Sequence, residues 1–280
     1  MKAIRALLFG LLGTAVLFTL FLSDLAAQET AVPHTVPVTT ITVNSGRDLD
    51  TSNSTTCATQ PCTLRRAVIQ ARNLPANQKP VLIAFDIPPA DAGCNAGVCR
   101  IQVAADFSVT QATVIDGYTQ PGATPNTIPA PGANDAQLKI EISNAAGFNS
   151  FRLFEGSGAL TLRGLAIFLP TGGMVSVSRS GLVLQGNWFG VSAAGTAPDY
   201  SGNGHVLSLS SCTASQMLIG GPAPADRNVI AGVAPMVEGC ADPIGGGSAH
   251  EQQVVAAGDA AQRLAADPVK LLARKRPGVR

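Results

Sequence analysis

The chain has 280 residues, of which 46% are hydrophobic and 13% are charged, and its formal net charge at pH 7 is +1. So large a hydrophobic fraction excludes a wholly disordered chain. The sparse and balanced charge excludes an extended basic surface, so we expect no nucleic-acid partner, because binding to phosphates requires clustered lysine and arginine.

The first 27 residues have the three parts of a secretory signal peptide. Lys2 and Arg5 precede an apolar run at 6–22, and the small residues Ala26 and Ala27 follow it. We therefore predict that residues 1–27 are removed and that the protein is secreted or held at the cell surface, with no other membrane segment. The alternative is an uncleaved membrane anchor, since 17 apolar residues lie near the lower limit for crossing a bilayer.

Residues 28–38 are predicted to be a lead-in linker, and 39–45 alternates polar and apolar residues as a strand does. Between Thr63 and Asn73 the apolar residues recur at i, i+3, i+4 and i+7, which predicts an amphipathic helix. Thr63 or the cysteine before it caps this helix, and Pro75 prevents its continuation. We expect the helix to cover the open first coil of a β-rich body.

Six cysteines in an exported chain predict disulfides. The spacing favours three pairs, although six cysteines allow fifteen pairings: Cys57 with Cys62, Cys94 with Cys99, and Cys212 with Cys240. The three histidines lie far in sequence from the closely spaced cysteines, so we predict no metal site and no cofactor.

Short β-rich segments follow the helix, among them 81–87 and 137–143, and the stretch 160–189 nearly repeats itself after 22 residues. The recurring positions are Leu160, Leu162, Gly164 and Ile167, which return as Leu182, Leu184, Gly186 and Phe189. Asn187 returns as Asn228 after 41 residues, close to two further periods. Such a period is typical of a β-solenoid, in which stacked asparagines satisfy backbone groups at the corners.

The segment "CTLRRAV" at 62–68 resembles the "CSLREA"-type motif of exported bacterial proteins, whose N-terminal module precedes pectin-lyase-like β-helix repeats. Further matching pieces follow in the same order: "IAFDIP" (83–88), "VIDGYTQPGA" (114–123), "LRGLAI" (162–167), "GNWFGVSAAGT" (186–196) and "IGGPAPADRNVIAG" (219–232). This resemblance covers roughly residues 39–232. One departure is Arg66, which stands where the family usually has glutamate, so that Thr63 lacks its capping-box partner and a cation lies near the helix N-terminus.

The resemblance implies an all-β, right-handed parallel β-helix over 39–244 with an N-terminal capping helix. Its N-terminal module would occupy about 39–125 and its repeats about 137–244. Residues 245–280 form a basic tail, for which a loosely ordered segment, a capping helix over 251–266 and a shifted reading frame all remain open. Members of the family are mostly uncharacterised, so the resemblance implies architecture and compartment and adds little about activity.

The acidic residues form no column at the repeat spacing, so we predict no catalytic residue. They are Asp86, Asp106, Asp116, Glu141, Glu155, Asp199 and Asp226. Two aromatic residues are candidate ligand contacts. By alternation, Trp188 faces solvent if Phe189 faces the core, and it can then stack on a sugar; burial under a neighbouring loop is the alternative. Tyr118 lies in a turn-rich loop.

We therefore expect a structural, adhesive or glycan-contacting surface protein, with surface glycans or cell-envelope components as partners. The alternatives are a polysaccharide lyase or hydrolase on the same scaffold and a truncated, non-functional member of the family. The oligomeric state stays open.

Overall fold

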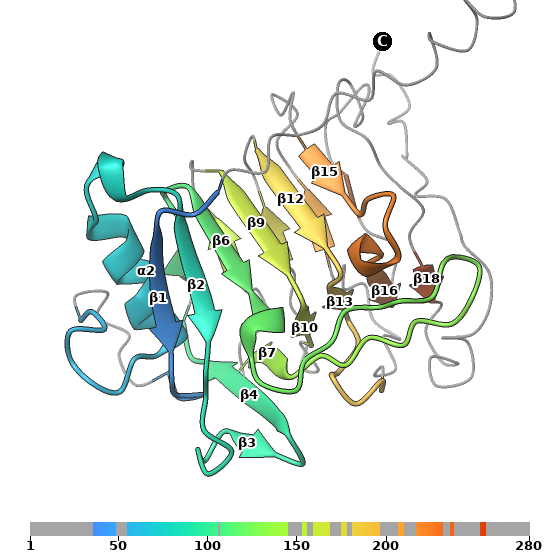
Figure 1. Ribbon diagram of the computed structural model, residues 1–280, viewed down its shortest axis with the longest axis horizontal. Coiled ribbons are helices and arrows are strands. Elements are labelled where there is room, and N and C mark those ends of the chain that lie inside the picture. The colour runs from blue at the N-terminus through green and yellow to red at the C-terminus, as the bar shows by residue number, and fades with distance from the viewer. Residues whose placement is uncertain are drawn as a thin grey trace, which may run out of the picture. The chain divides into compact units, whose positions relative to one another are not determined.

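The fold is mostly β, and Figure 1 shows its strands stacked in successive layers. The computed structural model describes residues 36–48, 55–105, 107–144, 153–155, 159–168, 175–177, 181–196, 207–209, 217–231, 236–237 and 253–255. The predicted signal peptide, Cys212 with Cys240, and nearly all of the predicted tail lie outside these residues.

Six strands form the first sheet, and every neighbouring pair in it is parallel. In spatial order they are β1 (Thr39–Val43), β2 (Val81–Phe85), β6 (Thr113–Asp116), β9 (Leu160–Arg163), β12 (Leu182–Gln185) and β15 (Met217–Ile219). Each strand pairs with the next one that the chain supplies to this sheet, which is how stacked coils pair.

Seven strands form the second sheet, and only its first pair, β3 with β4, is antiparallel. In spatial order they are β3 (Cys94–Asn95), β4 (Val98–Val103), β7 (Ile140–Asn144), β10 (Leu165–Ile167), β13 (Trp188–Phe189), β16 (Val229–Ala231) and β18 (Gln253–Val255). Within 251–266, the segment for which a capping helix was one of the alternatives, the described residues Gln253–Val255 form strand β18, which pairs in parallel with β16.

Shorter strands form two further parallel groups. They are β5 (Phe107–Ser108) with β8 (Leu153–Glu155), and β11 (Val175–Val177) with β14 (Leu207–Leu209) and β17 (Met236–Val237). Three 3-10 helices lie between other elements in the described part of the chain: η1 (Ala76–Gln78), η2 (Gly117–Thr119) and η3 (Pro224–Asp226). From β6 to β17 the chain visits the first sheet, the second sheet and these shorter strands in a constant order.

The 22-residue repeat corresponds to neighbouring strands in register. Leu160 pairs with Leu182 and Leu162 with Leu184, and all four side chains are buried in the same core. Alternation explains this burial, because every second residue of a strand points to the same face.

The 41-residue echo corresponds to a single step, which corrects its assignment to two periods. Trp188 pairs directly with Val229 across β13 and β16. The additional residues lie between these strands, where the chain also supplies β14 and β15. Stacking fixes how each strand pairs with its neighbour, and it does not fix the length of the loops that connect the strands.

The predicted helix is α2 (Leu64–Asn73), which lies against β1 and β2 (Figure 1). Thr63 caps it by accepting a hydrogen bond from the backbone N–H of Arg66 at 3.3 Å. The apolar side of the helix packs into the main core through Leu64, Ala67, Val68 and Ala71. The helix therefore covers this end of the first sheet, as the stripe predicts.

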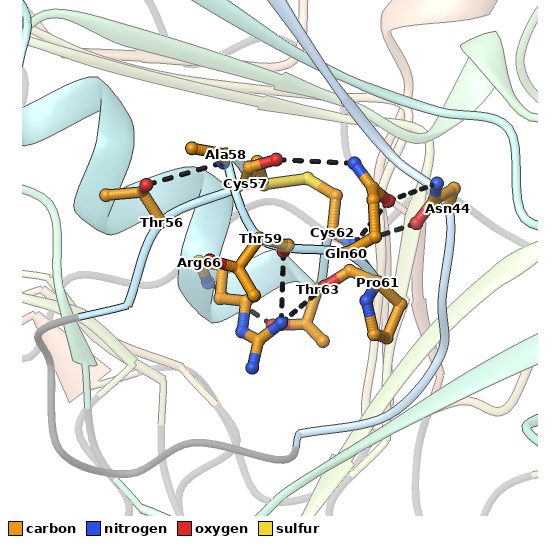
Figure 2. The surroundings of a disulfide bond; sticks show 10 residues. All are labelled: Asn44, Thr56, Cys57, Ala58, Thr59, Gln60, Pro61, Cys62, Thr63 and Arg66. Carbon is orange, nitrogen blue, oxygen red and sulfur yellow. Dashed lines mark hydrogen bonds between the residues drawn. A yellow bond between two sulfur atoms is a disulfide. The ribbon is translucent and has the colours of Figure 1, made fainter.

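Arg66 stabilises the loop before the helix, where a glutamate was expected to complete a capping box. Its guanidinium donates hydrogen bonds to the carbonyls of Thr59 at 3.1 Å and Pro61 at 2.8 Å, as Figure 2 shows. The Cys57–Cys62 disulfide closes the same loop. The guanidinium of Arg66 thus interacts with carbonyl oxygens outside the helix. Without these contacts, its charge would lie unfavourably at the positive end of the helix dipole.

The second predicted local disulfide, Cys94–Cys99, joins β3 to β4. Together the two disulfides indicate an oxidising or extracellular compartment, since such bonds rarely persist in a reducing cytosol.

Candidate functional site

An open groove of about 870 Å³ lies on the outer face of the second sheet, over β4 and β7. Three loops surround it: 46–48 after β1, 92–96 with the β3–β4 turn, and 192–196 after β13. A groove of this size is within the range of small-molecule and oligomer sites.

The floor of the groove consists of the outward residues of β4 and β7. Alternation along β4 buries Cys99, Ile101 and Val103 and exposes Arg100 and Gln102. Register then places these two exposed side chains beside two residues of the next strand: Arg100 beside Glu141 and Gln102 beside Ser143.

Glu141 is 1% exposed and is fully engaged. Its Oε1 accepts from the Nε of Arg100 at 2.6 Å, and its Oε2 accepts from the backbone N–H of Ala193 at 2.9 Å. Glu141 therefore links the floor to the 192–196 loop and holds Arg100, whose side chain is 57% exposed, above the sheet.

Asp91 shapes the wall between the first two loops. Its carboxylate accepts hydrogen bonds from Ser45 Oγ and from the backbone N–H groups of Gly46 and Gly93. Burial raises the pKa of Asp91, but these hydrogen bonds and the charge of Arg47 outweigh burial and lower the pKa below its ordinary value. An anionic Asp91 thus keeps the two loops together.

Asp48, at the end of the same wall, is bound from beneath by Arg65 of α2. The pair is buried and bidentate, with both N–O distances at 2.7 Å, and the backbone N–H of Ala104 also donates to Asp48. The capping helix therefore positions one wall of the groove as well as covering the core.

Three cations, three amides and one aromatic residue line the groove. They are Arg47, Arg100, Lys139, Asn95, Gln102, Gln137 and Phe168. Phe168 is partly exposed at the rim, directly after β10. Within the described ranges, no carboxylate lies within ion-pair distance of Arg47 or Lys139.

Trp188 is 6% exposed and lies outside the groove, so its prediction as an exposed sugar platform is wrong and burial under a loop is confirmed. It packs with Ala136 and Leu138 of the loop between η2 and β7. This green loop runs along the outer side of the strands in Figure 1. Asn126 fastens it by donating to the carbonyl of Pro224 at 2.8 Å.

Tyr118, the other candidate ligand contact, is partly buried at a corner of the fold and lies outside the groove lining. Its hydroxyl donates to the carbonyl of Gly186 at 3.0 Å, and Arg163 lies 5.8 Å from its ring centre. Burial raises the pKa of Tyr118 and also that of neighbouring Asp116. Each group therefore keeps its proton more readily than it would in water.

The repeated asparagines form a buried ladder at the next corner. Asn187 donates to the carbonyl of Leu162 at 2.7 Å and accepts from the N–H of Leu165 at 3.2 Å. Asn228 donates to the carbonyl of Leu184 at 2.9 Å and accepts from the N–H of Asn187 at 2.9 Å. Their predicted role at the corners is confirmed.

Sequence reasoning missed the groove residues Arg100, Lys139 and Phe168. The alternation in 98–103 already indicated that Arg100 and Gln102 share a face. Nothing local indicated that β7 is the neighbouring strand, because the two strands are separated by a long connection.

No protein-family model, curated protein or solved structure matches the chain. In the described part of the chain, no three His, Cys, Asp or Glu side chains gather as metal ligands. None of the helices described there has the length and apolarity needed to cross a membrane.

Proposed function

We propose that the chain is an exported right-handed parallel β-helix related to the CSLREA-type proteins, and that the groove on its second sheet binds glycans without cleaving them. Support for the winding comes from the constant order in which the chain visits the two sheets and the shorter strands. The two disulfides agree with export.

The observation that carries the binding role is the lining of the groove. Flat polar side chains, Arg100 and Gln102 on the floor and Asn95 on the wall, line the same groove as the partly exposed Phe168. Sugar rings carry hydroxyls around their edge and C–H groups on their faces. Planar amide and guanidinium groups match the hydroxyls, whereas an aromatic ring matches a C–H face.

The engagement of both groove carboxylates favours binding over cleavage. A glycosidase needs two carboxyl groups free to act on one bond, one as acid and the other as base or nucleophile. The oxygens of Asp48 accept from Arg65 and Ala104, and those of Glu141 accept from Arg100 and Ala193. Using either carboxylate in catalysis would break contacts that shape the groove.

A glycan array and a polysaccharide-degradation screen, run on the same preparation, test the proposal. We expect binding to a subset of glycans with no released products. The variants Phe168→Ala and Gln102→Ala should each weaken binding by about three- to tenfold, the range of one stacking or hydrogen-bonding contact. The control Asn73→Ala, on the exposed end of α2, should leave binding unchanged.

Two results would contradict the proposal. Turnover that disappears in the groove variants would establish the enzyme alternative. Binding that is insensitive to both groove variants, or no glycan binding at all, would remove the groove as the site.

A further inference from the structure

We infer that the glycan bound in this groove is anionic, a polysaccharide carrying carboxylate or sulfate groups, and this inference rests on the glycan-binding function proposed above. The argument starts from the charges of the lining. Three cations and two carboxylates line the groove, and both carboxylates are occupied by protein donors. The cations therefore set the charge that a ligand meets.

Asp48 contributes little negative field to the groove because a second cation neutralises it from below. Arg65 is buried against it, and the two side chains are 1% and 3% exposed. The positive charges of Arg47, Lys139 and Arg100 thus face two further anions among the described residues, Glu141 in the lining and Asp91 behind the wall, which leaves an excess of one positive charge. A groove lined by an excess of one charge attracts ligands of the opposite charge and concentrates them locally.

Arg100 is held so that part of its guanidinium stays available. Its Nε is occupied by Glu141, whereas its Nη groups have no acceptor among the residues described. A guanidinium has five N–H donors in a rigid plane, so a carboxylate or sulfate can receive paired hydrogen bonds from the free ones. Glu141 acts here as a positioning residue, since it fixes the plane of the arginine and touches no ligand itself.

Lys139 provides a second charge at a defined separation from Arg100. It lies two residues before Glu141, and its Nζ is close to the β3–β4 turn, 3.9 Å from where a side-chain carbon at Gly97 would stand. Strands about 4.8 Å apart and two residues of about 3.3 Å each place these backbone positions roughly 8 Å apart. Two cations separated in this way match the repeated charges of a polymer better than they match a single small anion.

Three polymers with one backbone separate charge from sugar identity: dextran, carboxymethyl-dextran and dextran sulfate. Their affinities would be measured by biolayer interferometry at low and physiological salt, for the wild type and for Arg100→Gln and Lys139→Gln. Lys79→Gln is the matched control, because it removes the same charge outside the groove lining. The fold of each variant would be checked by circular dichroism.

We expect both charged polymers to bind at least tenfold more tightly than dextran, with the affinity falling as salt screens the cations. Each groove variant should weaken the charged polymers by about two- to fivefold, the range of one partly exposed ion pair. Tighter binding of carboxymethyl-dextran would identify carboxylate as the recognised group, and tighter binding of the sulfate form would identify sulfate.

Equal binding of all three polymers, or a loss for Lys79→Gln as large as for the groove variants, would overturn the anionic ligand. The proposed glycan binding at Phe168 and Gln102 would not be affected by this result, because the glycan array tests it separately. Failure of the charged polymers to bind would likewise overturn this inference, because attraction between charges does not depend on one backbone.

Discussion

Replacing Asn187 with alanine tests whether the asparagine ladder holds the corners together. The side chain of Asn187 is fully buried and joins two strand ends, by donating to the carbonyl of Leu162 and accepting from the N–H of Leu165. Alanine removes both contacts, together with the 3.3 Å bond from Asn187 Nδ2 to Asn228 Oδ1, and leaves a space lined by backbone polar groups. The bond from the Asn187 N–H to Asn228 belongs to the backbone and remains available.

The magnitude follows from the two backbone groups that lose their partner. A buried donor or acceptor left unsatisfied costs about 1–3 kcal/mol, so Asn187→Ala should lower the free energy of unfolding by about 2–6 kcal/mol. This is a large part of a typical total of about 5–15 kcal/mol. Asn187→Asp should cost at least as much, because a carboxylate cannot donate to Leu162 and carries its charge into a buried site.

Equilibrium unfolding in urea, followed by circular dichroism, measures this loss. Asn95→Ala is the control, since that asparagine is exposed on β3 and its removal should change the free energy of unfolding by less than about 0.5 kcal/mol. If the free energy of unfolding of Asn187→Ala lies within about 0.5 kcal/mol of the wild-type value, the asparagine ladder does not stabilise the corner.

Three further predictions concern stability. Gly164→Ala should lower the free energy of unfolding by more than ~1 kcal/mol, because φ is +67° and the new side-chain carbon would stand 2.7 Å from the ring of Tyr118. Gly97→Ala is the control, since φ is +78° there but no atom is nearer than 3.9 Å to the new carbon. Thermal denaturation should show a clearly smaller loss of stability for this control. Asp48→Asn should cost about 3–5 kcal/mol in urea unfolding, since it removes the negative charge that the buried guanidinium of Arg65 contacts, and a loss under ~1 kcal/mol would contradict that pairing. The lowered pKa of Asp91 contributes stability that is fully present above about pH 4 and is lost as pH falls through the folded-state pKa. The stability difference between wild type and Asp91→Asn should therefore shrink in acid, and a constant difference from pH 6 to 2 would refute it.

Features that depend on near neighbours were predictable from the sequence. The spacing of apolar residues placed the α2 helix within one residue, since helical periodicity is a local property. The 22-residue repeat predicted the pairing of Leu162 with Leu184, because adjacent copies of one pattern bury the same face. The close cysteines predicted the Cys57–Cys62 and Cys94–Cys99 disulfides, since short loops bring them within bonding reach.

Features that depend on distant segments were decided only by the tertiary structure. Alternation placed Trp188 on the outer face of its strand, but it could not show that the loop tied down by Asn126 covers that face. The groove joins β4 to β7 across a 41-residue step and needs loops from three parts of the chain. A period of two residues determines the side on which a residue lies, whereas the order in which strands stack determines its neighbours.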